Sequence, residues 1–122
     1  MKLTNKFIII VPVFNAKDLI EEALMSIMSQ NFDDLGVIIR DDMSTDGTDD
    51  IIRNLLSIKG DNVKTKFNNK DVLFIRNDSK LYPVGNTYDS VINYVSNNES
   101  IIGVVDGDDK LSTSNAVKIM YD

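Results

Sequence analysis

Three carboxylates stand close together near the C-terminal end of the sequence, in the stretch Asp106-Gly107-Asp108-Asp109. They follow the short apolar run 101–105, which is bounded by turn residues and is typical of a strand buried on both faces. Carboxylate oxygens are the ligands that hard divalent cations prefer. The spacing therefore predicts a site for a divalent cation and a phosphate-bearing ligand where this strand ends.

The composition limits the chemistry that this site can perform. The 122 residues include neither cysteine nor histidine, which excludes disulfides, thiolate zinc sites and the Ser-His-Asp triad. The formal charge of −6 argues against nonspecific binding to nucleic acids or anionic membranes. The N-terminal apolar run is too short to span a membrane and lacks a cleavage-site pattern. We expect a cytoplasmic location, with peripheral membrane association as an option.

Short apolar runs alternate with stretches of helical periodicity along the chain. Strands are predicted at 7–13, 36–42, 72–75 and 101–105. Apolar stripes predict helices over 19–28, 51–56 and 84–95, and a last helix is expected to begin within 112–115. The polar stretch 60–70 predicts a loop. Candidate helix N-caps are Asn15, Ser44, Thr45 and Asp46.

This alternation favours right-handed crossovers and a mostly parallel sheet, so we predict a single α/β domain over 1–122. Ligands of such sheets bind beyond the carboxyl ends of the strands. Three polar clusters fall at those ends, namely 14–15, 41–46 and 106–109. Their coincidence supports a ligand site more strongly than any single motif does.

The acidic motifs have several other interpretations. The stretch 41–48 could be only a turn with an acidic helix start. A calcium-binding EF-hand loop from Asp42 fails at its twelfth position, which is Arg53. Neither a G-x-G-x-x-G motif nor a phosphate loop follows any strand. A phosphoacceptor domain would carry its acidic pair after the first strand, where this chain has Val13-Phe14-Asn15.

Four motifs, in this order, resemble those of the family 2 glycosyltransferases: 11–16 (Val-Pro-Val-Phe-Asn-Ala), Ser29-Gln30, 41–48 and 106–109. The resemblance extends through nearly the whole chain. It implies a Rossmann-like GT-A fold, a three-layer α/β/α arrangement with a mostly parallel central sheet, truncated after the D-x-D motif. It also implies an enzyme of the hexosyltransferase type. Such an enzyme transfers a sugar from a nucleotide diphosphate donor, usually with inversion and with Mg²⁺ or Mn²⁺.

The resemblance also implies roles for individual residues. Asp42 would accept a hydrogen bond from a uracil N–H, which favours a UDP-sugar donor, and Gly107 would leave room for the phosphates. The metal ligands would be Asp106, Asp108 and Asp109. The residues that contact the nucleotide sugar would be Pro12, Val13, Phe14, Asn15, Asp42, Ser44, Asn86, Asp106 and Gly107.

Two features depart from the family pattern. Tyr88 replaces the arginine that many members carry on the third helix, and the chain ends one helix after the D-x-D motif. The acceptor-binding half and its general base therefore have no counterpart, and the catalytic residue stays unassigned. The acceptor, a glycan or another hydroxyl compound, is likewise unassigned. The alternatives are a non-catalytic nucleotide-sugar-binding module, a subunit completed by a partner chain with an acceptor domain, or a relic of such an enzyme. Exposed apolar surface is expected to favour a homodimer. A sugar nucleotidyltransferase is more distant, because its glycine-rich and basic signature is missing after the first strand.

Overall fold

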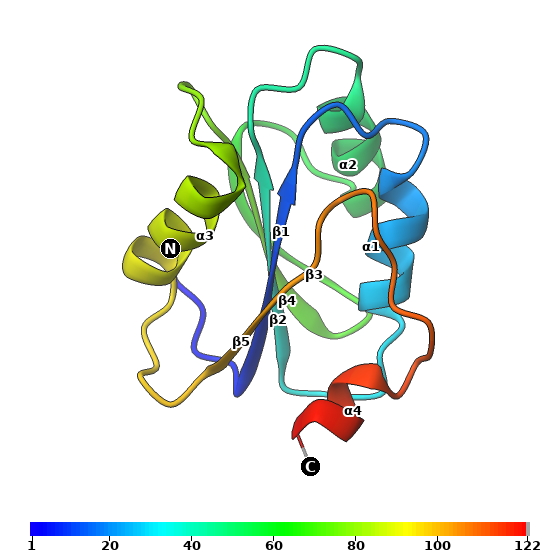
Figure 1. Cartoon of the computed structure of the whole chain (residues 1–122), viewed down its shortest axis with the longest axis vertical. Helices are drawn as coiled ribbons and strands as arrows, with labels where there is room; N and C mark the ends of the chain where they lie inside the picture. The colour runs from blue at the N-terminus through cyan, green and yellow to red at the C-terminus, as the bar shows by residue number, and fades with distance from the viewer. Residues whose placement is uncertain (122) are drawn as a thin grey trace.

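The computed structural model describes residues 1–121. Its sheet has the strand order β3-β4-β2-β1-β5 (Figure 1). The strands are β1 (Phe7–Val13), β2 (Leu35–Asp41), β3 (Asn62–Phe67), β4 (Lys70–Arg76) and β5 (Ile101–Val104). The helices are α1 (Ile20–Met28), α2 (Thr48–Leu56), α3 (Tyr82–Tyr94) and α4 (Ala116–Tyr121). Strands β4, β2, β1 and β5 are parallel, whereas β3 runs antiparallel to β4.

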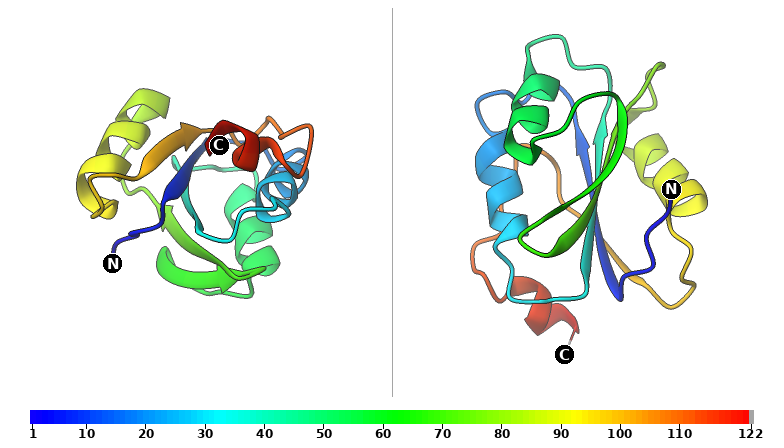
Figure 2. Two further views of the ribbon diagram at one scale, coloured as in Figure 1. Left: turned by 90° about the horizontal axis from the view of Figure 1, so that it is seen from below. Right: turned by 180° about the vertical axis from the view of Figure 1, so that it is seen from behind.

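The helices form layers on both faces of the sheet, with α1 and α2 on one side and α3 on the other (Figures 1 and 2). Strand β1 lies between the layers and is buried along its whole length. Its alternate residues Phe7, Ile9 and Val11 belong to the larger core with α1 and α2. Ile8 and Ile10 belong to the smaller core on the opposite face. The predicted three-layer α/β/α arrangement with a mostly parallel sheet is confirmed.

The predicted loop over 60–70 is wrong, because this stretch contains β3 and its turn into β4. Strand β3 is an edge strand whose residues are exposed or half-buried in alternation. Strand β3 is polar and contains no apolar run. Its extended conformation therefore depends on pairing with β4 and not on burial. The pairing of Phe67 with Lys70 leaves a two-residue turn, in which Asn68 and Asn69 have φ values of 50° and 63°. Positive φ at both positions is the geometry of a type I′ hairpin.

The prediction that the 101–105 run is buried on both faces is also wrong. Within the described residues β5 pairs with β1 alone, and Ile101 and Val104 are 42% and 51% exposed. Helix α3 also exposes apolar side chains, because Val84 and Tyr88 lie on its outward face. Together with Val104, this face lines an apolar groove of about 540 Å³.

A buried arginine explains why α3 turns its polar side to the sheet. The guanidinium of Arg40, on β2, donates hydrogen bonds to Asp89 (2.7 Å) and Ser90 (3.0 Å) on α3. It also donates to the side-chain oxygen of Asn77 at 2.8 Å. Because a buried cation needs such partners, the polar residues of α3 face inward and its apolar stripe faces outward.

The predicted helix N-caps are wrong. Asn15 does not cap α1, which begins at Ile20 without a side-chain cap. The N-cap of α2 is Gly47 and not Ser44, Thr45 or Asp46, although Asp46, one residue earlier, accepts a hydrogen bond from the N–H of Thr48 at 3.0 Å. Helix α4 begins at Ala116, one residue after the predicted window.

Candidate functional site

A pocket of about 500 Å³ opens at the carboxyl ends of the parallel strands. The loops after β1, β2, β4 and β5 contribute to it, so the three polar clusters named from the sequence meet at this edge of the sheet. Every residue predicted to contact the nucleotide sugar lines the pocket, except Ser44. The complete lining is Pro12, Val13, Phe14, Asn15, Ala16, Leu19, Asp42, Lys80, Tyr82, Pro83, Asn86, Asp106, Gly107 and Asp108.

Ser44 lies behind the pocket wall and joins two of its loops. Its hydroxyl donates to Asp41 at 2.5 Å and accepts from the backbone N–H of Asn15 at 2.9 Å. The side-chain oxygen of Asn15 in turn accepts from the backbone N–H of Thr45 at 2.8 Å. These bonds hold Asn15 at a left-handed φ of 48°. The loops after β1 and β2 are thereby fixed relative to each other.

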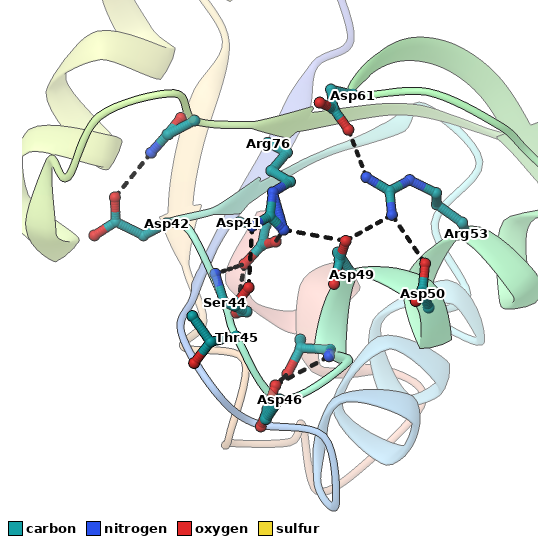
Figure 3. Close-up of polar contacts among 12 residues, drawn as sticks. Asp41, Asp42, Ser44, Thr45, Asp46, Asp49, Asp50, Arg53, Asp61 and Arg76 are labelled. Atoms are coloured by element: carbon teal, nitrogen blue, oxygen red, sulfur yellow. Dashed lines mark hydrogen bonds and ion pairs between the residues drawn. The ribbon is translucent and has the colours of Figure 1, made fainter.

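The two adjacent aspartates at the end of β2 have different environments (Figure 3). Asp41 is fully buried and faces Arg76, which lies 3.4 Å from Asp41 and 3.1 Å from Asp49. Arg53 continues this network from Asp49 on α2 at 2.7 Å. Burial raises the pKa of Asp41 despite the opposing hydrogen bonds from Ser44 and the charge of Arg76. Asp41 is therefore a structural residue that anchors β2 to α2.

Asp42 faces the pocket but is only 2% exposed. One carboxylate oxygen accepts from the side chain of Asn77 (3.0 Å) and the backbone N–H of Leu81 (2.8 Å). The other accepts from the backbone N–H of Tyr82 at 2.9 Å and lies 3.5 Å from the Lys80 ammonium. Burial alone would raise the pKa of Asp42, but these hydrogen bonds and the Lys80 charge outweigh it and hold the pKa below its ordinary value.

The three carboxylates after β5 lie on the rim of the pocket. Asp106, Asp108 and Asp109 are exposed, and one oxygen of each lies within 4.8 Å of the others. Asp106 and Asp108 line the pocket, whereas Asp109 lies beside them. Partial desolvation of its carboxylate, together with the negative charges of Asp108 and Asp109, raises the pKa of Asp106. An all-oxygen, all-anionic donor set of this size suits a hard divalent cation.

Gly107 is buried within this loop and its N–H donates to the carbonyl of Pro12 at 3.0 Å. A Cβ at this position would lie 2.5 Å from Cγ2 of Val13, closer than packing allows. The glycine is thus needed for contact with the end of β1, which holds the carboxylates beside the pocket. Space for phosphates remains an implication of the family resemblance.

The sequence analysis missed Lys80, whose side chain lines the pocket from the segment between β4 and α3. That segment also follows the carboxyl end of a parallel strand, so the rule that identified the other three clusters could have identified it. Tyr88, named as the replacement of the usual arginine, lies outside the pocket. Its ring faces the groove on the outer side of α3.

Comparisons with known proteins identify relatives of this chain. The model of the family described as Glycosyl transferase family 2 matches residues 8–121. A Campylobacter jejuni protein, the GalNAc(5)-diNAcBac-PP-undecaprenol beta-1,3-glucosyltransferase, is 46% identical over 50 residues, which are 41% of this chain and 16% of that protein.

Solved structures share the fold. The crystal structure of S. aureus TarS has a TM-score of 0.69 at 24% identity, over 95% of this chain and 19% of that one. The mannosyltransferase PcManGT from Pyrobaculum calidifontis, in complex with GDP-Man and Mn²⁺, has a TM-score of 0.71 at 23% identity. That match covers 98% of this chain and 33% of PcManGT. The chain thus spans a third or less of the length of these proteins.

Within residues 1–121, no helix combines the length and apolar character that crossing a membrane requires. The family match extends over nearly all of the sequence, and the neighbouring structures have the same layered fold. The chain belongs to glycosyltransferase family 2.

Proposed function

We propose that the pocket binds a nucleotide diphosphate sugar, with a UDP-sugar favoured, as the donor site of an inverting glycosyltransferase. The observation that carries this proposal is the convergence of four loops on one pocket that has three clustered carboxylates at its rim. The pocket combines an apolar wall that includes Phe14 with polar side chains such as Asn15 and Asn86. This combination suits a ligand with a flat base, a ribose and a charged diphosphate.

Asp106, Asp108 and Asp109 would hold Mg²⁺ or Mn²⁺ at this rim. The fit is supported by their oxygen donors, which lie within 4.8 Å of one another. Desolvation and the charges of Asp108 and Asp109 raise the pKa of Asp106, and a bound cation would offset this repulsion. When bound, the cation supplies positive charge that stabilises the departing nucleoside diphosphate. The protein's own contribution is to hold these carboxylates next to the pocket through the Gly107–Val13 contact.

No general base or acceptor contact is assigned within residues 1–122, and a partner chain or a second copy is a proposed source of them. This part of the proposal is supported by the relatives, of which this chain spans 16% to 33%. Without such a contribution, the chain would act as a nucleotide-sugar-binding module. The acceptor would be a glycan or another hydroxyl compound, reached in the cytoplasm. The undecaprenol in the name of the C. jejuni relative supports a peripheral position at a membrane.

Calorimetric titration of the chain with UDP, with and without Mn²⁺, tests this proposal. We expect binding that depends on Mn²⁺ and that is lost in Asp106→Asn and Asp108→Asn. The matched control is Asp18→Asn, which removes the same charge from an exposed residue outside the pocket. Equal binding by all variants would overturn the metal site, and no binding of any nucleoside diphosphate would overturn the donor site.

A further inference from the structure

Helix α1 carries a row of polar side chains beside the chain that follows the acidic loop, residues 106–109. Glu22, Ser26 and Gln30 follow one another at intervals of four residues, a spacing that places side chains on one face of a helix. Gln30 lies just beyond the last residue of α1 and continues the row. The segment between β5 and α4 runs beside α1 toward its C-terminal end (Figure 1). The row therefore lies along the path of the chain that leaves the acidic loop.

The first two members of this row contact the chain directly after the loop. Glu22 forms an ion pair with Lys110. The hydroxyl of Ser26 donates to the carbonyl of Ala23 at 2.7 Å and accepts from the backbone N–H of Leu111 at 3.0 Å. Because its proton is committed to the helix, the Ser26 oxygen is left as an acceptor for the segment. This bond fastens the chain to α1 two residues beyond the acidic loop.

Gln30 is only 3% exposed, and its side-chain amide makes three hydrogen bonds. Its nitrogen donates to the carbonyl oxygens of Ser26 at 2.9 Å and Thr113 at 2.8 Å. Its oxygen accepts from the backbone N–H of Val117, in the first turn of α4, at 3.0 Å. A glutamate would lose both donors at this position, and an apolar side chain would lose all three bonds. The Ser29-Gln30 motif of the sequence thereby gains a structural role.

The acidic loop needs support on both sides, because its three clustered carboxylates repel one another. On its N-terminal side, two hydrogen bonds of 3.0 Å, from the backbone N–H groups of Val105 and Gly107, join it to β1. On its C-terminal side, the chain pairs with no strand within residues 1–121. The contacts with Ser26 and Gln30 supply the support there.

We propose that Ser26 and Gln30 are positioning residues for the divalent cation of the donor site. By fixing the chain after the loop along α1, they keep the carboxylates of Asp108 and Asp109 beside that of Asp106. Neither residue lines the pocket, so both act through the backbone of the loop. This inference rests on the proposed donor site and extends it to the residues that support its metal ligands. Such supporting residues commonly change metal affinity by about 10–100-fold.

Amide hydrogen exchange of the metal-free chain tests the support directly. The amide of Leu111 donates to Ser26, and that of Asp109 donates to the carbonyl of Asp106 at 2.9 Å. We expect both amides to exchange about tenfold faster in Ser26→Ala than in the wild type. Ser26→Thr keeps the hydroxyl and should restore slow exchange. Ser29→Ala is the matched control, because it removes the same hydroxyl from an exposed residue that donates within α1 instead.

Calorimetric titration with UDP at a low and at a saturating Mn²⁺ concentration tests the consequence for the cation. At low Mn²⁺, Ser26→Ala and Gln30→Met should bind UDP about tenfold more weakly than the wild type, whereas Ser26→Thr and Ser29→Ala should not. Saturating Mn²⁺ should restore most of the affinity, because mass action refills a weakened cation site. Asn69→Ala, at the distant β3–β4 turn, should keep wild-type binding and so separates loss of stability from loss of position.

Each other outcome overturns a defined part of the inference. Unchanged exchange of Leu111 and Asp109 in Ser26→Ala would show that Ser26 does not hold the loop. Faster exchange with wild-type UDP binding at low Mn²⁺ would overturn the positioning role and leave the donor site standing. A loss that saturating Mn²⁺ does not restore would also overturn it, because the cation is then not what is lost. If the wild type shows no Mn²⁺-dependent binding of UDP, the donor site fails and this inference with it. Thermal unfolding checks the fold of each variant, and Ser26→Ala decides the question if Gln30→Met does not fold.

Discussion

The carboxylate of Asp42, at the end of β2, accepts a hydrogen bond of 2.9 Å from the backbone N–H of Tyr82, at the start of α3. Tyr82 has a φ of 64°, a left-handed conformation that costs a non-glycine residue about 1–2 kcal/mol. Asp42 thus stabilises a strained turn and sets where α3 begins. Because Lys80 and Tyr82 both line the pocket, this one carboxylate also shapes its wall.

Replacing Asp42 with Asn should lower the free energy of unfolding by about 1–3 kcal/mol at pH 7. An amide has one acceptor oxygen, so its NH₂ group would face at least one of the backbone donors of Leu81 and Tyr82. Urea denaturation of Asp42→Asn and wild type measures the difference. Equal midpoints would show that Asp42 does not hold this turn.

The stability of Asp42→Asn should also depend on pH differently from that of the wild type. The folded state lowers the pKa of Asp42 below that of the unfolded chain, which is about 3.9. The stabilisation is therefore fully present above about pH 4 and is lost as the pH falls through the folded pKa, because the unfolded state takes up the proton first. As the pH falls below about 4, Asp42→Asn should therefore lose less stability than the wild type. Equal pH profiles would contradict the lowered pKa.

The parts of the fold that burial determines are predictable from the sequence. Strand β1 is apolar and mostly β-branched, as expected of a strand with both faces covered, and it spans the predicted residues 7–13. The rule that ligands bind beyond the carboxyl ends of parallel strands locates the pocket without any structure. It brings together Asn15, Asp42 and Asp106, which are far apart in the sequence.

The parts that depend on distant partners could not be predicted. Helix α3 has an apolar stripe, yet its polar side is buried because Arg40, 50 residues away from Ser90, needs hydrogen-bond partners there. Strand β5 has the composition of a buried strand, but within residues 1–121 it pairs with β1 alone and is half exposed. The strand-end rule could have placed the segment of Lys80 at the pocket, but the contacts of its ammonium with Phe14 and Asp42 follow only from the structure.

Gly107→Ala should weaken Mn²⁺-dependent UDP binding at least tenfold and destabilise the fold by about 1–3 kcal/mol. The added Cβ would lie 2.5 Å and 2.7 Å from two atoms of Val13, so the loop that carries Asp106 and Asp108 must move. Calorimetry and thermal unfolding measure the two effects. Gly103→Ala is the matched control, because its Cβ would meet the Phe7 ring at a milder 3.2 Å. If Gly107→Ala binds UDP as tightly as the wild type, the close contact of this glycine with Val13 does not position the carboxylates.

Asn69→Gly should raise the free energy of unfolding by about 0.5 kcal/mol. Asn69 is the second central residue of the β3–β4 turn and has a φ of 63°, which glycine adopts without strain. The greater freedom of glycine in the unfolded chain offsets part of this gain. Asn69→Ala, in contrast, should lower stability by about 1 kcal/mol. Urea denaturation ranks the three proteins, and an alanine variant as stable as the glycine variant would exclude a left-handed turn.

Helix α3 allows a test in which a polar residue matters more for folding than an apolar one. Ser90 is fully buried and its hydroxyl accepts a 3.0 Å hydrogen bond from Arg40, whereas Ile92 is 57% exposed. Ser90→Ala leaves part of a buried guanidinium without a partner and should cost about 1.5–3 kcal/mol. Ile92→Ala removes side-chain atoms that are mostly in contact with water and should change stability by less than about 0.5 kcal/mol. The reverse order in urea denaturation would mean that α3 packs its apolar stripe against the sheet.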